Sequence, residues 1–464
     1  MTASRSDALP EVSPATRAGR SLRQQALRGA SWIMFSELAA QAVRLAGNVA
    51  AAHLLMPQAF GLMGLVTIAR RGLTMFADVG LSPSIIRSDR GEDPAFLRTA
   101  WTIQIIRGVV LWLIACALAW PMAFFYGEAM LLVLLPVAAI VSLIGGFDAI
   151  TIFVLNRRLQ LGRISLLELT RQIINVAVVV SVALIWQSVW ALVFGALAGA
   201  VYRLAVSHGM WRLPGFRHRP GWEPAAMREL LGFGVWIFMA TALTFLATYA
   251  DRLILGKLLT MELFGVFVIA YVMTEAPRAL ISKLNNRVVL PAISSRRDLP
   301  TPELRRKILY HRGRLLRVVA LGLAGVVCVG DQIIFVLYDE RYVQAGWMLP
   351  VLAMGLWPKV LGTTLNPALL ARGKPQFNTL GQLLKLIAIL VALPAAFGGY
   401  GIVGAVAVIA LADLPHYLTV LVASAREGLS ASTQDLVHTV LFAVVVGAFV
   451  TARAAMGFGT PFSF

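Results

Sequence analysis

The sequence has little charge and almost no cysteine. Of its 464 residues only 14% are charged and 58% are hydrophobic, whereas about 25% of the residues in a typical soluble domain are charged. This excludes a soluble protein and predicts a chain that crosses a membrane several times. Both cysteines, Cys116 and Cys328, lie in apolar runs. We therefore expect small buried side chains there, with no disulfide framework and no metal site.

The chain also lacks the motifs of common enzymes. It contains no Walker loop, no paired-cysteine metal motif and no Gly-x-Ser-x-Gly elbow. We therefore expect no enzyme, no cofactor and no ATP-driven step. A net charge of +18 would suggest nucleic acid in a soluble protein. Here the basic residues lie mostly in loops between apolar runs, so membrane topology explains them and no nucleic-acid partner is expected.

Apolar segments long enough to cross a bilayer, which takes roughly 20 residues, recur along the whole chain. We expect an all-α membrane protein with thirteen helices. They are predicted near 31–53, 60–82, 97–119, 131–154, 164–186, 188–210, 231–254, 262–283, 315–337, 345–368, 377–397, 403–423 and 434–454.

The distribution of Lys and Arg between the predicted loops fixes the orientation. Alternate loops are rich in basic residues, whereas the loops on the other side hold only Arg252, Lys257, Arg341 and Arg453. Because basic loops stay in the cytoplasm, the N-terminus is predicted to be cytoplasmic. Thirteen spans then place Phe464 outside.

A stretch near the N-terminus recurs 204 residues later. Trp32-Ile33 matches Trp236-Ile237, and Phe60-Gly61 matches Phe264-Gly265, without a gap. The offset covers six predicted helices, an even number, so the chain is predicted to form two parallel six-helix bundles around a central cavity, with one extra C-terminal helix. The expected parts are a disordered basic tail 1–26, bundle 27–211, cytoplasmic linker 212–228, bundle 229–424, and the extra helix and tail 425–464.

Charged and amide side chains recur at helical spacing within these spans, so each set lies on one face of its helix. A charge at the bilayer centre costs roughly 2.5–3.5 kcal/mol on insertion scales, which favours faces turned towards a water-filled space. The charged residues of these stripes are Glu37, Arg44, Arg71, Asp78, Glu168, Arg171, Asp251, Glu275, Arg278, Lys359 and Lys385.

Cations are in excess near the middle of the membrane, which predicts an anionic cargo. The candidate cargo-binding residues are Arg44, Arg71, Arg107, Lys359 and Lys385. The one acid counted at that depth is Glu275. Ion pairing that only stabilises the bundle, such as Glu37 with Arg44, explains any single residue equally well, but stripes on seven helices favour a cargo site. Arg70 lies off the stripe of Arg71 and has no evident partner.

Two further polar residues stand three apart around a proline. Asp413 and His416 flank Pro415 in the predicted helix 403–423. A proton site is one interpretation, and a polar pair at a kink is the interpretation that the proline favours.

Short motifs resemble the polysaccharide-transport family of oligosaccharide flippases, in the multidrug/oligosaccharidyl-lipid/polysaccharide exporter superfamily. They are Leu55-Met56-Pro57-Gln58-Ala59-Phe60-Gly61, Phe76-Ala77-Asp78-Val79-Gly80-Leu81-Ser82 and Asp251-Arg252-Leu253-Ile254-Leu255-Gly256. The resemblance covers residues 27–424. It implies two bundles forming a V, and translocation of a polyprenyl-pyrophosphate-linked oligosaccharide across a bacterial inner membrane. Membrane lipids, a polysaccharide polymerase or glycosyltransferases are the other implied partners.

Two other functions remain open. A multidrug or cation antiporter of the same superfamily would need an acidic cavity, whereas this sequence predicts a cationic one. A membrane glycosyltransferase or polysaccharide polymerase would need a sizeable outer loop with catalytic side chains, and the predicted outer loops are short.

Overall fold

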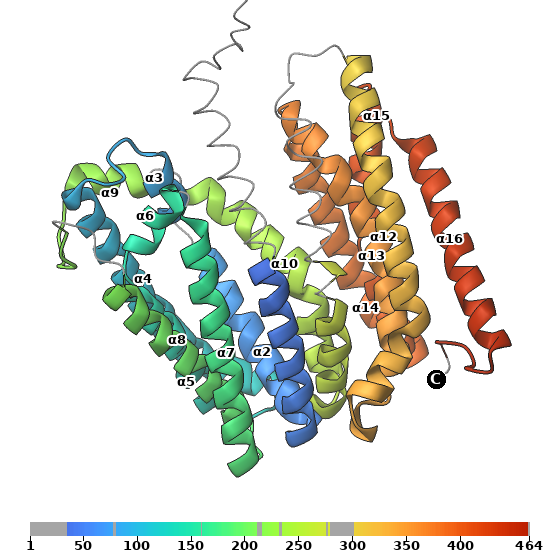
Figure 1. Ribbon diagram of the computed structural model, residues 1–464, viewed down its shortest axis with the longest axis horizontal. Coiled ribbons are helices and arrows are strands. Elements are labelled where there is room, and N and C mark those ends of the chain that lie inside the picture. The colour runs from blue at the N-terminus through green and yellow to red at the C-terminus, as the bar shows by residue number, and fades with distance from the viewer. Residues whose placement is uncertain are drawn as a thin grey trace, which may run out of the picture.

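A computed structural model of the chain describes residues 35–77, 80–158, 160–210, 216–231, 234–274, 277–278 and 301–462. Each of the thirteen predicted segments contains helix within this part of the chain, which confirms the all-α membrane fold. Trp32, Asp78, Glu275, Phe464 and the tail 1–26 lie outside the described residues. Figure 1 shows two groups of helices side by side, with their ribbons converging at the lower end of the view.

The first half consists of a helix over residues 35–54 and helices α2 to α8. Their bounds are α2 Pro57–Phe76, α3 Leu81–Arg87, α4 Pro94–Tyr126, α5 Leu131–Gly146, α6 Thr151–Arg157, α7 Leu161–Ile185 and α8 Trp190–Met210. Helix α9, Pro224–Leu231, packs against α3 and α4. The sequence did not predict α3 or α9, because both are too short to span a bilayer.

The second half begins with α10 and ends with the extra helix. Its bounds are α10 Gly234–Leu258, a helix Met261–Thr274, α12 Thr301–Leu337, the short helix η1 Glu340–Tyr342, α13 Ala345–Ala371, α14 Gln376–Leu411, α15 Leu414–Arg426 and α16 Ser432–Ala455. Among the described helices, seven are long and apolar enough to cross a membrane, or eight when the bent pair α5 and α6 counts as one span.

Several helix ends differ from the predicted ones. Helix α12 starts at Thr301 instead of 315. The extra turns are amphipathic: Leu304 and Ile308 are buried in the core, while the opposite face is polar. Gly401, at φ 60°, separates the two predicted spans that α14 joins. The predicted helix 131–154 is broken between α5 and α6, which meet at 63°.

The two halves meet around a pair of equivalent glycines. A Cβ on Gly61 would collide with Met261 O, and a Cβ on Gly265 would collide with Pro57 O. Each residue in the first contact lies 204 positions from its counterpart in the second, so the interface repeats itself about an axis between these glycines. This reciprocal contact is what two parallel repeats require.

Hydrogen bonds also join the two halves at one end of the molecule. The loop charges assign this end to the outside, and it is called the outer side below. Arg341, on η1, donates to Ala52 O and His53 O, each at 3.1 Å. Tyr342 donates from its hydroxyl to Leu55 O at 3.3 Å. These carbonyls end the helix over residues 35–54, so a cation from the second half caps a helix of the first.

Helix α16 is fastened to α12 near both of its ends. Arg312 of α12 is fully buried and pairs with Asp435, in the first turn of α16. Arg453, in the last turn of α16, pairs with Asp331 of α12 at 2.5 Å. The exposed face of α16, which includes Val440, is apolar and suits contact with lipid. The thirteenth helix is therefore packed into the second half by buried charges.

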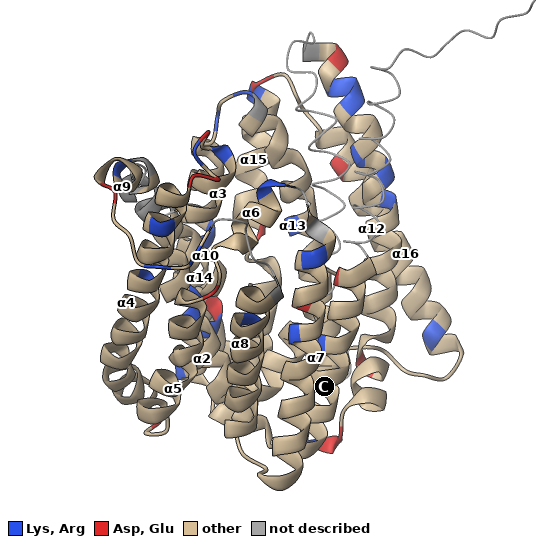
Figure 2. Ribbon diagram, turned by 60° about the vertical axis from the view of Figure 1, so that its left-hand side comes forward, with Lys and Arg blue, Asp and Glu red and all other residues tan. Residues whose placement is uncertain are grey.

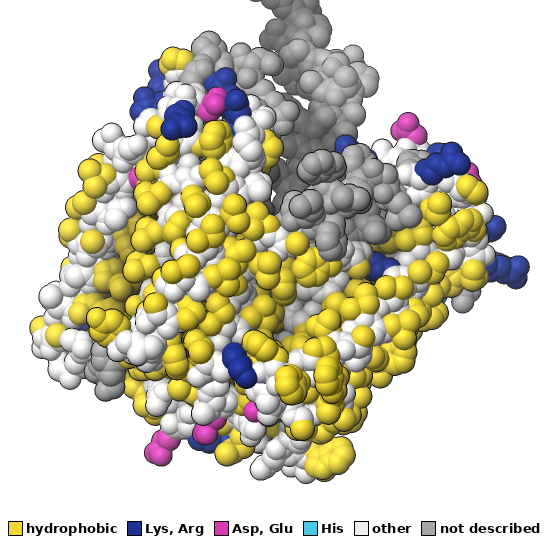
Figure 3. Space-filling view, turned by 180° about the vertical axis from the view of Figure 1, so that it is seen from behind, with side chains coloured by type: hydrophobic (Ala, Val, Ile, Leu, Met, Phe, Trp, Pro, Cys, Tyr) yellow, Lys and Arg dark blue, Asp and Glu magenta, His cyan; other side chains and the backbone are white. Residues whose placement is uncertain are grey.

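Two cations that the sequence assigned to outer segments are buried within helices. Arg453 is 4% exposed on α16, and Arg252 is 9% exposed on α10. The loop count therefore overstated the outer charge. Lys and Arg gather at the upper end of the molecule, which holds α3 and α9, and a few lie at mid-height (Figure 2). Hydrophobic side chains cover most of the face between the two ends (Figure 3).

Candidate functional site: polar side chains within the bundles

Arg44 lies on one face of the helix over residues 35–54 with two acceptors. Its Nε donates to Gln41 Oε1 at 3.1 Å, and its Nη2 lies 3.4 Å from Glu37 Oε1. The Arg44 and Glu37 side chains nevertheless remain 36% and 41% exposed. The predicted Glu37–Arg44 pairing is therefore present, and it leaves the Arg44 guanidinium accessible.

Further arginines of the first half lie on α2 and α7. Arg71 is exposed on α2, and Arg171 on α7 pairs with Glu168. Arg70 interacts electrostatically with both Arg71 and Arg171, and its Nη1 is buried with no hydrogen-bond partner in the described part of the chain. Below, Arg70, Arg71 and Arg171 are called the arginine cluster. Arg70 was absent from the predicted site because it lies off the stripe of Arg71.

The second half holds its cations differently. Lys385 Nζ lies 2.7 Å from Asp413 Oδ1, and Lys359 Nζ lies 3.7 Å from Asp413 Oδ2. The count that left Glu275 as the acid at this depth is wrong, because Asp413 lies between both lysines. Asp413 stands where α14 ends and α15 begins, so the break beside Pro415 turns its carboxylate towards α13 and α14.

A small cavity adjoins these lysines, with a volume of about 40 Å³. Asp251, Tyr271, Arg278, Lys359, Lys385 and Asp413 are among its lining residues. Arg278 Nη1 donates to the Tyr271 hydroxyl at 3.3 Å. The structure thus brings five of the predicted polar residues together, and adds Tyr271 to them.

The hydrogen-bond partner of His416 is Asn378 and not Asp413. Its Nε2 lies 2.9 Å from Asn378 Oδ1, and a Cβ on Gly381 would crowd the His416 ring. Asn366 donates to the same Asn378 oxygen at 3.1 Å. This closely packed amide network favours the interpretation of a polar pair at a kink over that of a proton site.

Arg252 is a buried cation that sequence reasoning missed. It pairs with the preceding Asp251 and lies over the Tyr249 and Tyr271 rings, with its Cζ 4.5 Å and 4.2 Å from their centroids. Two stacked aromatic faces stabilise a desolvated guanidinium. The signal in the sequence was Tyr249 one turn before Arg252, but its position near the predicted end of a span assigned it to a loop.

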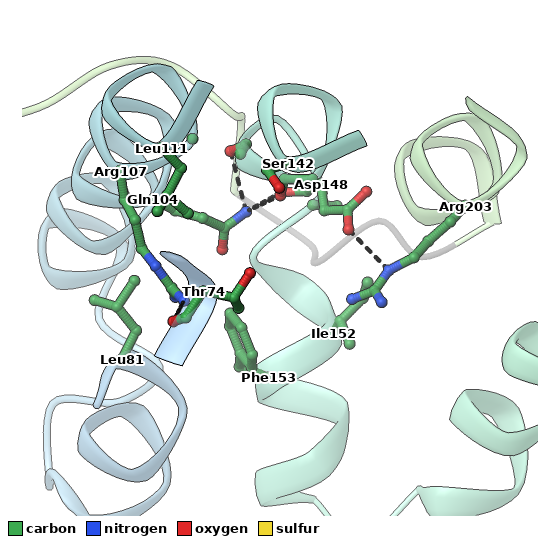
Figure 4. Close-up of a pocket in the computed structure, with 14 residues that line it drawn as sticks. Thr74, Leu81, Gln104, Arg107, Leu111, Ser142, Asp148, Ile152, Phe153 and Arg203 are labelled. Carbon is green, nitrogen blue, oxygen red and sulfur yellow. Dashed lines mark hydrogen bonds and ion pairs between the residues drawn. The ribbon is translucent and has the colours of Figure 1, made fainter. Parts of the chain in front are cut away.

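Arg107 is not part of the arginine cluster and lines a separate cavity of the first half. Its Nη2 donates to Thr74 O at 3.1 Å. The same cavity is lined by Gln104, Asp148 and Arg203, none of which was among the predicted site residues (Figure 4). The five predicted cations therefore divide into four places. Arg71 belongs to the arginine cluster, Arg44 pairs with Glu37, Lys359 and Lys385 share one carboxylate, and Arg107 lines this second cavity.

Comparison with known proteins gives the family. Residues 51–346 match the family described as polysaccharide biosynthesis protein. The chain is 24% identical over 313 residues to the teichuronic acid biosynthesis protein TuaB of Bacillus subtilis (strain 168). That match covers 65% of this chain and 62% of TuaB, so the chain spans less than two thirds of that relative's length.

Solved structures share the fold. The lipid II flippase MurJ, in an inward closed conformation, superposes with a TM-score of 0.65 at 13% identity over 93% of this chain and 99% of MurJ. An inward-facing multidrug resistance transporter of the MATE family, in the MOP superfamily, gives 0.62 at 13% identity over 87% of this chain and 94% of that one. The family model matches more than half of the chain, so the chain belongs to the polysaccharide biosynthesis protein family, as a multi-pass membrane protein with the fold of these two structures.

Proposed function

We propose that the protein moves a polyprenyl-pyrophosphate-linked oligosaccharide across a bacterial inner membrane, with its N-terminus in the cytoplasm. The glycan would serve the synthesis of a surface polysaccharide such as an O-antigen, a capsule or an exopolysaccharide. Polysaccharide polymerases or glycosyltransferases would be the enzymes that receive or supply it. The names of TuaB and of the MurJ flippase support a cargo of this kind.

The arginine cluster carries this proposal. Three guanidinium groups from α2 and α7 interact in the first half, with Glu168 as the acid paired to Arg171, and Arg70 Nη1 is buried without a partner among the described residues. A pyrophosphate brings about two negative charges, and arginine meets phosphate oxygens with two parallel hydrogen bonds. The cluster is therefore suited to hold the one part of a lipid-linked glycan that a bilayer excludes most strongly.

Movement of the cargo would follow from the parallel halves. Contacts about the Gly61–Gly265 axis and the Arg341 bonds hold the outer ends together in this conformation. Rocking of one half against the other would open the outer side and expose the same site there, as parallel-repeat transporters do. The Arg341 bonds would then break.

The test is binding of purified full-length protein in lipid nanodiscs. Probes are undecaprenyl pyrophosphate, undecaprenyl phosphate, undecaprenol and the cationic dye ethidium. The cluster predicts that pyrophosphate binds most tightly, that undecaprenol binds weakly, and that added salt weakens the difference. Tighter binding of ethidium than of undecaprenyl pyrophosphate would overturn the proposal and favour the drug antiporter.

A further inference from the structure

A second cavity in the first half contains groups that the arginine cluster does not use. It has a volume of about 240 Å³ and is formed by α2, α3, α4, α8 and the broken pair α5 and α6. Figure 4 shows Arg107 and Arg203 at opposite ends of the group, with Gln104 and Asp148 between them and Phe153 below. Sites for drug-sized ligands measure about 300–1,000 Å³, so this cavity suits a smaller group.

The helix break beside the cavity is held by one amide. Between Gly146 and Thr151 the chain leaves the helix, which frees backbone carbonyls within the membrane. Gln104 Nε2 lies 3.2, 3.1 and 3.0 Å from the carbonyl oxygens of Gly145, Gly146 and Asp148. Non-helical backbone at membrane depth is tolerated where it lines a cavity, and it is a common feature of transporter binding sites.

Two oxygen atoms of residues that line the cavity are buried without a hydrogen-bond donor in the described part of the chain. They are Gln104 Oε1 and Asp148 Oδ1, on side chains of residues that are 8% and 7% exposed. The other Asp148 oxygen already pairs with Arg203 Nε at 2.8 Å. A buried acceptor without a hydrogen-bond partner destabilises the protein by about 1–3 kcal/mol. A ligand that donates hydrogen bonds to both oxygens would remove this cost.

The charges of the cavity restrict what that donor can be. Arg107 and Arg203 repel a metal ion, and the two acceptor oxygens disfavour an anion. A neutral group with several hydroxyls fits both conditions, because each hydroxyl donates to an acceptor and accepts from a guanidinium. Phe153 adds an apolar ring surface to the lining. These are the features of a site for one sugar ring.

The cavity also lies beside the arginine cluster. Thr74 lines it and stands three residues after Arg71 on α2, which is about 4.5 Å along the helix. Arg107 donates to Thr74 O and so ties α4 to this point of α2. A sugar attached directly to a pyrophosphate on Arg70 and Arg71 would reach this cavity first.

We infer that the cavity is a subsite for the first sugar of the cargo, with Gln104 Oε1 and Asp148 Oδ1 accepting from its hydroxyls. The inference rests on the proposed function and adds a selection step to it. A carrier lipid without a sugar would fill the arginine cluster alone, whereas a glycosylated one would fill both sites.

Gly145 provides a way to fill the cavity without disturbing the protein. It lines the cavity, and a Cβ built on it would have no neighbour within 4 Å. Gly145→Leu therefore places an apolar side chain where the sugar would lie. Gly322→Leu is the matched control, because a Cβ there also meets nothing within 4 Å and the residue is exposed on α12.

The experiment measures binding to the full-length protein in nanodiscs. Probes are undecaprenyl pyrophosphate, bare or carrying one glucose, galactose or N-acetylglucosamine. Wild-type protein and Gly322→Leu should bind at least one glycosylated lipid about tenfold more tightly than the bare lipid. Gly145→Leu should bind both with the affinity of the bare lipid, and this unchanged affinity shows that the variant is folded.

Two results would overturn the subsite and leave the proposed function standing. One is a wild-type protein that binds bare and glycosylated lipids equally, as it would if water alone met the two oxygens. The other is a Gly145→Leu variant that keeps the full preference for the sugar. A wild-type protein that binds none of the four lipids would overturn the proposed function and the subsite together.

Discussion

Arg44 has two roles that a double substitution separates. If Arg44 only neutralises Glu37, the variant Glu37→Gln, Arg44→Gln removes both charges and should export glycan at the wild-type rate. If Arg44 binds the pyrophosphate, this variant should fold and insert but export at least tenfold less, and Arg44→Lys should restore export only in part. Surface polysaccharide and the amount of inserted protein are the two measurements. Wild-type export by the double variant would remove Arg44 from the site.

Arg70 should lower the stability of the folded protein while supporting cargo movement. Its buried Nη1 lacks a partner among the described residues, so Arg70→Met should stabilise the folded protein by about 1–3 kcal/mol. The same substitution should cut cargo movement at least tenfold, because it removes a guanidinium from the arginine cluster. Unfolding in detergent and glycan export test the two effects. Arg163→Met, at an exposed position of α7, should change neither. Normal export by the Arg70→Met variant would contradict a binding role.

The sequence could identify polar faces, but it could not pair their members across helices. The pair Glu37 and Arg44 was visible because both lie on one helix. Glu168 and Arg171 were placed on one helix face but were not recognised as a pair. Asp413 was not recognised as the partner of two lysines, because the break at the start of α15 rotates it away from a regular helical face. Side chains such as Arg70, with a buried group that no described residue satisfies, become visible only once their surroundings are known.

At the scale of elements, the buried pair of α12 and α16 should control the stability of the second half. Asp435→Asn would leave the fully buried Arg312 without its counter-ion, which costs about 3–5 kcal/mol. The double variant Arg312→Met, Asp435→Leu should recover most of that loss, since apolar replacements need no counter-ion. Chemical unfolding of the three proteins in detergent measures this. Equal stability of Asp435→Asn and wild type would show that α16 is only loosely attached.

The linker after α8 should respond to pH through His218. Its ring lies 5.4 Å from that of Trp101 and 4.5 Å from that of His208, between centroids. Burial, followed by the charge of His208, lowers the pKa of His218 from 6.5 to about 4. A histidine with a lowered pKa stabilises the docked state above pH 6.5, and this contribution is lost as pH falls towards 4.

Hydrogen exchange of the linker amides tests this pH dependence. The Gly221 and Glu223 N–H groups donate to the Thr102 and Thr99 hydroxyls at 3.0 Å, so docking protects them. Their protection should fall between pH 6.5 and pH 4, after correction for the intrinsic exchange rate. His218→Phe should flatten that change. A wild-type linker with constant corrected protection over this range would refute the role of His218.

Element positions followed from the sequence more readily than element ends. Apolar runs located the described membrane helices, because a run of that length has few alternatives to a membrane helix. The break between α5 and α6 escaped detection because Gly145 and Gly146 are also compatible with a continuous apolar helix, and Gln104, whose amide satisfies the freed carbonyls, lies far away in the chain.

At the scale of the whole molecule, the repeat was readable from a few paired landmarks, while the interface needed the structure. Phe60-Gly61 and Phe264-Gly265 marked equivalent helices. The reciprocal contacts of the two glycines show why these landmarks recur, since only a residue without a Cβ lets the helices approach so closely. This close approach decides which charged faces of the two halves meet. The residue pattern of a single helix does not contain that information.

The central claim is that the arginine cluster moves a pyrophosphate-linked glycan across the bilayer. The most direct measurement is made in proteoliposomes that contain fluorescent undecaprenyl-pyrophosphate-linked glycan, with a membrane-impermeant quencher that reports its arrival at the far leaflet. Wild-type protein should move the lipid well above the rate of protein-free vesicles, Arg163→Met should match it, and Arg70→Met combined with Arg71→Gln should fall to the protein-free rate. Wild-type vesicles no faster than empty ones, or a double variant as fast as wild type, would contradict the account.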